Sequence, residues 1–192
     1  MIVKMERETK ETKILISLSR GSDPSHIDTG VGFLDHMLEL FAFHGHLVLD
    51  CMVTGDTRVD DHHTTEDVGI VIGQLLAQLC EDKKGITRYG HAYVPMDETL
   101  SRTVIDISGR PYLSFNACFS KEKVGTFDTE LVEEFFRGLV INARYTVHVD
   151  LIRGGNAHHE IESIFKSFAQ SLRIAMSASG SERIPSSKGV IE

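Results

Sequence analysis

Two short segments of this sequence place a pair of adjacent histidines a few residues before a glutamate. Imidazole and carboxylate groups are frequent ligands of transition metals, so either segment could contribute to a metal site. One such pair alone more often caps a helix or makes surface hydrogen bonds, but its repetition with the same spacing favours metal binding. The candidate ligands are His62, His63 and Glu66 in the first segment and His158, His159 and Glu162 in the second.

The spacing restricts what these residues can bind if each segment begins a helix. Residues i and i+4 share a helix face, so His62 can approach Glu66, and His63 can approach Glu66 at i+3. Adjacent residues point about 100° apart around the axis, so His62 and His63 reach two different ions more easily than one. Two such segments could build two metal centres, each with ligands from both. Zinc is the general default, while six-coordinate manganese or iron fits a larger ligand set.

Two further histidines are candidate ligands that the spacing alone leaves open. His36 follows Asp35 at the start of a predicted helix, and His148 lies in an alternating segment shortly before the second histidine pair. The other histidines stand near turns or near the ends of predicted elements, where we expect them to be solvated. They are His26, His44, His46 and His91.

Isolated cations near predicted turns favour a small anionic ligand over a polymer. Lys188 stands in the loop 185–189, where hydroxyl and backbone N–H groups could hold a phosphate, and Arg88 and Arg110 stand singly elsewhere. Asp97 follows a proline-containing strand and could act as a general base or cap a turn. The sequence has no P-loop, no G-x-G-x-x-G and no His-Glu-x-x-His motif.

The composition allows a buried core around these residues. The chain has 192 residues, of which 41% are hydrophobic and 25% charged, so it fits one domain or two halves of about 90 residues. The formal net charge is −8 without any Lys/Arg block, which argues against nucleic-acid binding. The three cysteines lack metal-site spacing, and we expect them to be reduced and mostly buried. They are Cys51, Cys80 and Cys118.

No segment of the sequence indicates a membrane protein or a secreted one. The first thirteen residues are strongly charged, unlike a signal peptide. The longest apolar run, residues 68–80, contains Gln74 and Gln78 and is too short to span a bilayer. We therefore expect a cytoplasmic protein with no membrane partner.

Hydrophobic periodicity predicts the elements that position these residues. Strands are expected at 12–20, 25–29, 47–53, 91–95, 101–107, 112–119 and 145–152. Helices are expected at 33–43, 64–80, 129–142 and 160–178, with Gly45 as a C-terminal cap of the first. Both halves run strands, helix, strand, loop and His-His helix. The order indicates one domain, 1–192, made of two pseudo-repeats at about 1–88 and 89–192.

Six segments together resemble the imidazoleglycerol-phosphate dehydratase family and follow its order over nearly the whole chain. They are Phe33–Leu38, Asp60–Asp67, Pro95–Glu98, Ser108–Tyr112, Gly155–His159 and Pro185–Gly189. The resemblance implies an α/β (α+β) fold that is internally duplicated, each half being a four-stranded sheet with helices packed on one face. It also implies a homo-oligomer of 24 subunits with active sites where subunits meet.

The resemblance implies site residues and a cofactor, two manganese ions (Mn2+) per active site. The implied metal ligands are His36, His62, His63, Glu66, His148, His158, His159 and Glu162. The implied phosphate-binding residues are Arg88, Arg110, Ser186 and Lys188. The candidates for proton transfer are Glu162 and Glu11, with Asp97 in support, and the sequence does not divide the steps among them.

The implied reaction is the dehydration of D-erythro-imidazoleglycerol phosphate to imidazoleacetol phosphate in histidine biosynthesis. The substrate would be held as an imidazolate between the two metal ions. Some family members carry Gln at the position of Leu40, so phosphate binding here would depend more on the cations. Two other classes could use the same histidines, namely a non-enzymatic metal-binding protein and a dinuclear metal hydrolase.

Overall fold

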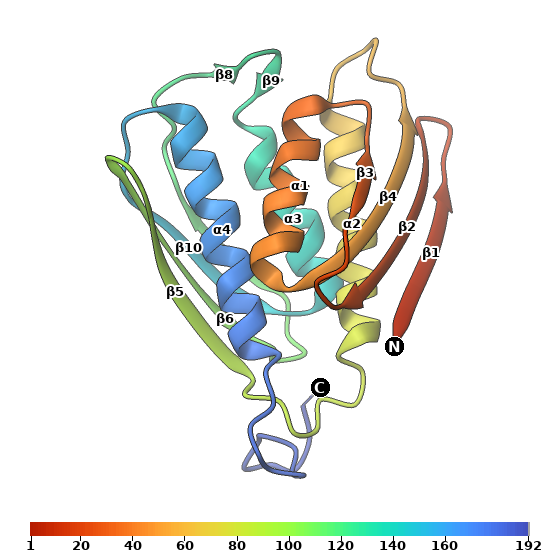
Figure 1. Cartoon of the computed structure of the whole chain (residues 1–192), viewed down its shortest axis with the longest axis vertical. Helices are drawn as coiled ribbons and strands as arrows, with labels where there is room; N and C mark the ends of the chain where they lie inside the picture. Colours follow the sequence, from red (N-terminus) through yellow and green to blue (C-terminus); the bar gives the residue numbers. More distant parts are fainter. Residues whose placement is uncertain (192) are drawn as a thin grey trace.

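The computed structural model describes residues 1–191, and the first half of the chain folds into four strands and two helices. Figure 1 shows these elements in the warm colours of its sequence scale. In chain order they are β1 (Ile2–Glu8), β2 (Thr12–Arg20), β3 (His26–Asp28), α1 (Gly32–Gly45), β4 (Leu47–Gly55) and α2 (His62–Leu79).

The second half repeats this order and adds one small hairpin. In chain order its elements are β5 (Tyr89–Met96), β6 (Thr99–Asp106), β7 (Tyr112–Asn116), β8 (Lys123–Val124), β9 (Phe127–Asp128), α3 (Leu131–Ala143), β10 (Thr146–Arg153) and α4 (Ala157–Ala175). Strands β8 and β9 form the hairpin, which precedes α3.

The two main sheets have the same strand order and the same strand directions. The first sheet has the order β1-β2-β4-β3 and the second the order β5-β6-β10-β7. In each sheet the first three strands pair antiparallel and the last pairs parallel. The expected fold class, two similar halves that each carry a four-stranded sheet, is confirmed. The division of the chain at about residues 88 and 89 stays a prediction.

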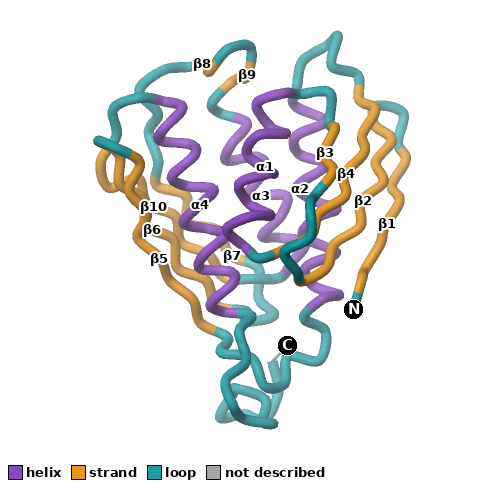
Figure 2. The backbone as a smooth tube through the Cα atoms, in the orientation of Figure 1, coloured by secondary structure: helices purple, strands orange, loops and turns teal. Residues whose placement is uncertain are grey.

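The four helices lie between the two sheets, as Figure 2 shows with purple helices between orange strands. Helix α2 packs on β2, and α4 packs on β5 and β6, so each helix covers one face of its own sheet. The two halves meet through the helix pairs α1–α4 and α2–α3. The core therefore consists of the inner faces of both sheets and the helices between them.

The two helix pairs meet in different ways. In the α2–α3 pair, a Cβ added to Gly69 would meet the carbonyl oxygen of Phe135, so the two backbones lie in close contact. In the α1–α4 pair, side chains fill the gap, among them Phe41 and Phe168 with ring centroids 6.1 Å apart. Glycine is required at position 69 because any side chain there would push the helices apart.

Several details differ from the sequence expectations. Strand β1 was not expected, because its charged residues conceal the alternation, and only Val3 is buried. The residue that ends α1 in the left-handed conformation is His46, with φ of 52°, rather than Gly45. Two of the cysteines are buried as expected, but Cys118 is exposed. Among residues 1–191, no helix combines the length and apolar character that crossing a membrane requires.

Candidate functional site

Helices α1 and α4 bring three predicted metal ligands together near their N-terminal ends. The ligand atoms of His36, His158 and Glu162 all lie within 4.8 Å of one another. One Glu162 oxygen, Oε2, lies 3.2 Å from His158 Nε2 and 3.7 Å from His36 Nε2. Because His36 belongs to the first half and the other two residues to the second, the contact between halves creates this group. We call these three residues the closed cluster.

The carboxylate of the closed cluster is held in its charged form. The side chain of Glu162 is only 9% exposed, and its other oxygen lies 2.5 Å from Nζ of Lys166, one turn further along α4. Burial acts to raise the pKa of Glu162, but Lys166, His158 and His36 outweigh it and leave the pKa below its ordinary value. The group therefore offers a buried anion between two imidazoles, which suits a divalent cation.

The first His-His segment is more open. His62 Nε2 lies 3.7 Å from Glu66 Oε2, as the i+4 spacing predicts, and both side chains are more than 40% exposed. His63 turns away from Glu66 and toward Asp56, whose carboxylate lies 3.1 Å from Nδ1. We call His62 and Glu66 the open pair, since no third ligand joins them within residues 1–191 in the way His36 joins the closed cluster.

The two rings of each histidine pair face different partners, as the helix geometry predicts. His159 does not join the closed cluster but places Nδ1 at 3.1 Å from Glu98 Oε2. Hydrogen bonds from the backbone N–H groups of Glu98 itself and of Asn156, together with His159, lower the pKa of Glu98 to about 2. Asp97 also lies within 4.8 Å of this group and adopts a positive φ of 48° in the turn between β5 and β6.

The candidate proton carriers are separated in the chain. Glu11 Oε1 lies 3.8 Å from His63 Nε2, and the Glu11 side chain is half exposed. Glu162 belongs to the closed cluster, and Asp97 accompanies Glu98 and His159. All three carboxylates thus neighbour a predicted metal-binding histidine, but each neighbours a different one.

The four predicted phosphate-binding residues line one polar cleft of about 500 Å³. Arg88 is held in place there by Asp106, with Nε 2.7 Å from the carboxylate, and by the Pro185 carbonyl, which accepts from Nη1 at 2.8 Å. The hydrogen bond that Arg88 donates to Asp106 raises the pKa of Arg88, which stays charged. The other three cleft residues are Arg110, Ser186 and Lys188. Their cations and hydroxyls suit a phosphate group.

The phosphate cleft and the metal-binding candidates lie at opposite ends of α4. The backbone N–H of Arg88 donates to the carbonyl of Ala175, the last residue of α4, whereas His158 is its second residue. The 1.5 Å rise per residue separates these positions by about 26 Å. Figure 1 shows the same arrangement, with the starts of α2 and α4 at the top and the C-terminal segment at the bottom.

His148 lies on the second sheet, on the strand that contacts Arg110 of the phosphate cleft, and not with the other predicted ligands. Its side chain points to the exposed face of the second sheet, where its ring centroid is 5.6 Å from that of Tyr112. Two residues earlier, the Thr146 hydroxyl donates to the carbonyl of Arg110 at 3.1 Å. The structure therefore separates His148 from the closed cluster and the open pair.

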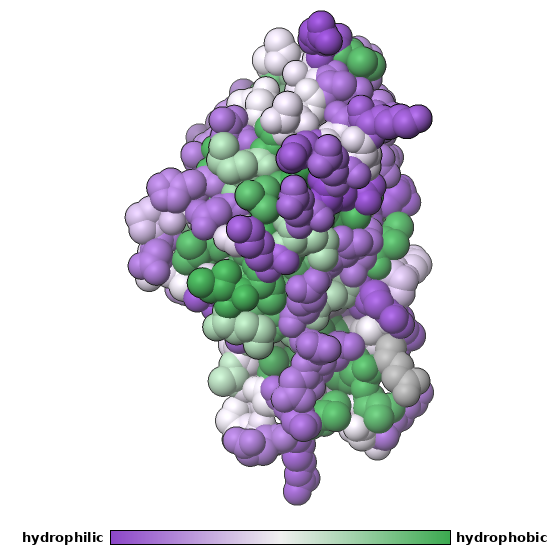
Figure 3. All heavy atoms as spheres, turned by 90° about the vertical axis from the view of Figure 1, so that its right-hand side faces the viewer, coloured by the Kyte–Doolittle hydropathy of each residue, from purple (hydrophilic) through white to green (hydrophobic). Residues whose placement is uncertain are grey.

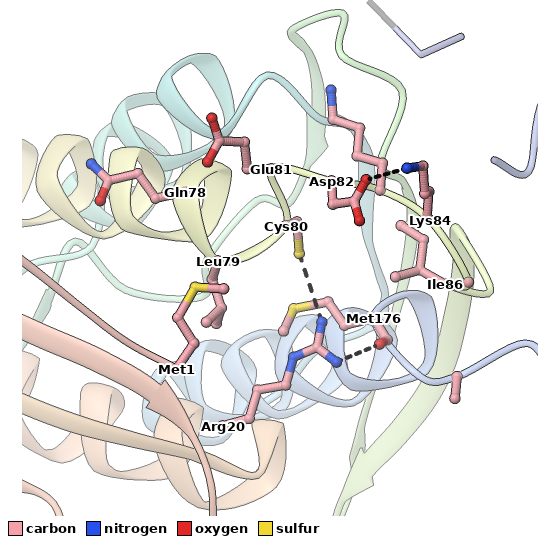
Figure 4. Close-up of a pocket in the computed structure, with 13 residues that line it drawn as sticks. Met1, Arg20, Gln78, Leu79, Cys80, Glu81, Asp82, Lys84, Ile86 and Met176 are labelled. Atoms are coloured by element: carbon pink, nitrogen blue, oxygen red, sulfur yellow. Dashed lines mark hydrogen bonds and ion pairs between the residues drawn. The ribbon is translucent and has the colours of Figure 1, made fainter. Parts of the chain in front are cut away.

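Two other cavities do not coincide with these groups. One of about 720 Å³ lies between the C-terminal ends of α2 and α4, where Arg20 donates to the Met176 carbonyl at 2.9 Å and approaches Cys80 (Figure 4). None of the predicted site residues lines it. A second, of about 580 Å³, runs along α1 and is lined by His36 and Leu40, so it borders the closed cluster.

Three residues near the predicted ligands were missed by sequence reasoning. Lys166 stands four residues after Glu162, and this helical spacing could have indicated it. Asp56 and Glu98 come from loops distant in sequence from the histidines they contact, so spacing within a motif could not reveal them. Of the four histidines expected to be solvated, His44 is half-buried and the other three are exposed.

Comparisons with known proteins identify relatives over the full length of the chain. The profile of a family described as imidazoleglycerol-phosphate dehydratase matches residues 29–172. Proteins of that name are 69% identical over 193 residues in Staphylococcus carnosus (strain TM300) and 66% identical over 192 residues in Staphylococcus aureus (strain N315). In both cases the match covers 100% of this chain and of the relative.

Solved structures agree with the sequence relatives. The crystal structure of imidazoleglycerol-phosphate dehydratase from Staphylococcus aureus subsp. aureus N315 has a TM-score of 0.87 at 63% identity, covering 93% of this chain and 100% of that one. The structure of IGPD from Pyrococcus furiosus in complex with (S)-C348 has a TM-score of 0.83 at 37% identity, covering 97% and 99%. The similarity thus extends over both halves of the fold.

Proposed function

This chain belongs to the imidazoleglycerol-phosphate dehydratase family, and we propose that it dehydrates imidazoleglycerol phosphate to imidazoleacetol phosphate in histidine biosynthesis. One observation carries the proposal. The chain gathers imidazole and carboxylate groups at one end and cations with hydroxyls at the other. A substrate with an imidazole ring at one end and a phosphate at the other needs both kinds of group. The cytoplasmic location expected from the sequence stays a prediction.

The donor set fits a divalent transition metal, and we assign two manganese ions to each site. Buried Glu162 with two imidazoles supports one ion, and the open pair with imidazoles from elsewhere supports the other. When bound, such ions would polarise the substrate imidazole and lower the pKa of its ring nitrogen. The proposed ligands are His36, His62, His63, Glu66, His148, His158, His159 and Glu162.

The residues of the chain itself would orient the substrate and move its protons. Arg88, already fixed by Asp106, together with Lys188 would hold the phosphate and so position the carbon chain. Glu11 and Glu162, with Asp97 in support, are carboxylates that could accept the proton lost from carbon and deliver one to the departing hydroxyl. The half-exposed Glu11 is the more accessible of the first two.

A complete site would need more than one copy of the chain. The substrate joins ring to phosphate through a short carbon chain, which cannot reach along the length of α4. We therefore place the closed cluster and open pair of one copy against His148 and the phosphate cleft of another, within the 24-subunit particle that the family resemblance implies. Exposed apolar side chains on the sheet faces support contacts between copies; on the second sheet they include Tyr89, Tyr93 and Tyr112.

The first sheet also carries apolar surface that is suited to contacts between copies. Figure 3 shows that side of the molecule, with hydrophobic residues gathered among hydrophilic ones. Ile2, Leu15 and Met52 are exposed large apolar side chains of β1, β2 and β4. Such surface is typical of interfaces between proteins.

A turnover assay tests the proposed function. Purified protein is stripped with a chelator, reloaded with Mn2+ and given imidazoleglycerol phosphate. We expect imidazoleacetol phosphate to form without release of inorganic phosphate. No product from the reloaded protein would refute the proposal, and release of phosphate would indicate a hydrolase instead. A Lys188→Ala variant should chiefly raise KM, whereas the exposed Lys84→Ala variant, outside the cleft, should not.

A further inference from the structure

The second histidine of each pair faces a carboxylate with the same ring nitrogen. Nδ1 of His63 lies 3.1 Å from Asp56 Oδ2 and 3.2 Å from Oδ1. Nδ1 of His159 lies 3.1 Å from Glu98 Oε2. The two carboxylates come from different loops, so the arrangement is not a by-product of one repeated motif.

Backbone hydrogen bonds fix the carboxylate of Glu98 and the main chain of Asp56. The second oxygen of Glu98, Oε1, accepts the N–H of Asn156 at 2.7 Å, and the Asn156 side chain in turn accepts from the N–H of His158 at the start of α4. The backbone N–H of Asp56 donates to the carbonyl of Glu11 at 3.1 Å, and the Asp56 carbonyl accepts from Val59 at 2.7 Å. Each histidine therefore meets a carboxylate whose residue is held in its loop by backbone hydrogen bonds.

A carboxylate at Nδ1 decides how a neutral imidazole can bind a metal. The proton resides on Nδ1 and is donated to the carboxylate, so Nε2 carries the free lone pair. We propose that Asp56 and Glu98 are positioning residues that fix the ring orientation of His63 and His159 and direct Nε2 toward the metal ions. The proposal rests on the metal site of the proposed function.

The carboxylate that faces Nδ1 of the second histidine comes from a different position in each half. Glu11 and Glu98 occupy equivalent positions, each directly before the second strand of its sheet. The residue after β4 is Asp56, but the residue after β10 is Gly154, which has no side chain. In the second half Glu98 must therefore hold its histidine.

In the first half, Glu11 does not have to orient the histidine, because Asp56 does so. Asp56 occupies Nδ1 of His63, and Glu11 lies on the other side of the ring, 3.8 Å from Nε2. A carboxylate on that side lies where the metal and substrate would bind. The asymmetry therefore assigns the holding role to Asp56 and makes Glu11 available for proton transfer.

Metal affinity measured without substrate tests the inference. Equilibrium dialysis with Mn2+ compares the assembled wild-type protein with Asp56→Ala, Asp56→Asn, Glu98→Ala and Glu98→Gln. We expect each alanine variant to lose affinity by roughly 10–100-fold. Asp56→Asn and Glu98→Gln keep an oxygen that accepts the hydrogen bond from Nδ1–H, so these variants should retain part of the Mn2+ affinity that the alanine variants lose. The Mn2+ electron paramagnetic resonance spectrum should broaden or split in the alanine variants as the ligand geometry changes.

Matched variants separate positioning from folding and from catalysis. Asp50→Asn, on the outer face of the first sheet, should bind Mn2+ like the wild type. Glu11→Gln should also keep its metal affinity within about threefold, since Glu11 does not hold Nδ1. Wild-type affinity in a folded Asp56→Ala or Glu98→Ala protein would overturn the inference. Wild type that binds Mn2+ but lacks dehydratase activity would overturn the proposed function alone.

Discussion

The two His-His helices begin in equivalent places of the two halves, yet their surroundings differ. At α4, Glu162 is nearly buried and meets two imidazoles and a lysine. At α2, Glu66 is 44% exposed, and within residues 1–191 its carboxylate pairs with His62 alone. The same sequence spacing therefore produces a closed cluster in one half and an open pair in the other.

The difference comes from the helix that lies beside each motif. Helices α1 and α3 both end at a left-handed residue, His46 in α1 and Arg144 in α3. Ten residues before these ends stand His36 and Glu134. His36 completes the closed cluster, whereas Glu134 pairs with Arg137 on its own helix. The neighbouring helix thus brings a third side chain, His36, to the motif of the second half.

One chain thus forms the closed cluster by itself, whereas the proposed metal site at the open pair needs ligands from another copy. The lysine at α4 strengthens the contrast, because the equivalent position of α2 holds Ile70.

Removing a ligand of the closed cluster should have the largest effect. His158→Ala deletes one of its three donors, and we expect the loss of one of the two ions. Turnover should fall roughly a thousandfold or more, since a catalytic ion contributes several kcal/mol. Metal analysis and turnover measure the change, with the exposed His26→Ala as a control. Full metal content in His158→Ala would show that the closed cluster is not a metal site.

The close packing of α2 on α3 offers a test on stability. Gly69→Ala places a methyl group against the carbonyl oxygen of Phe135, and we expect the free energy of unfolding to fall by about 1–3 kcal/mol. Gly32→Ala, where the added Cβ meets nothing within 4 Å, should change it far less. Urea unfolding of both variants gives the comparison. Equal unfolding free energies for Gly69→Ala and Gly32→Ala would mean that the α2–α3 contact is packed no more tightly than the start of α1.

The lysine of the closed cluster should control its response to acid. Lys166 helps to lower the pKa of Glu162, so Lys166→Met should raise that pKa. Protons would then displace the metal at a higher pH than in the wild type, because Glu162 must be charged to bind it. Metal retention during acidification measures this shift, and Lys13→Met, on the first sheet, should follow the wild type. If Lys166→Met retained metal at the same pH values as the wild type, Lys166 would not control the acid response of the closed cluster.

The smallest expected effect lies on the outer sheet faces, where cross-strand pairs differ. The first sheet pairs Leu15 with Met52, while the second pairs Arg102 with Asp150 at 2.8 Å. The hydrogen bond from Arg102 lowers the pKa of Asp150, so this stabilisation is complete above the ordinary pKa of an aspartate. It is lost as pH falls through the lowered value.

An Asp150→Asn variant measures this contribution. We expect the free energy of unfolding to fall by at most about 1 kcal/mol at neutral pH, because the ion pair is partly exposed to solvent. The difference in unfolding free energy between this variant and the wild type should vanish in strong acid, where Asp150 is protonated in both the folded and the unfolded protein. Thermal unfolding at several pH values provides the measurement. A difference that persists at low pH would show that the effect is not electrostatic.

The sequence predicted the helices, most strands and the duplication, because apolar periodicity is local and strong. It missed β1, where charged residues occupy the exposed positions of an edge strand. It began α4 three residues late, so His158 and His159 lie inside the helix rather than before it. Element type followed from pattern, while boundaries depended on caps such as Asn156, whose side chain accepts from His158.

The candidate site could be predicted only where its geometry is local. The i+4 contacts of His62 with Glu66 and of His158 with Glu162 follow from helix spacing. The position of His36 beside α4 depends on how the halves pack, which no spacing reveals. The placement of Asp56 and Glu98 depends on loops in the same way.

The two ends of α4 have a genetic consequence. If each site joins the metal end of one copy to the phosphate end of another, an allele with a damaged His158 and an allele with a disrupted phosphate cleft each encode an inactive protein. Expressed together, they would form mixed particles in which some junctions unite an intact metal end with an intact phosphate end. Two loss-of-function alleles of one gene would then complement each other.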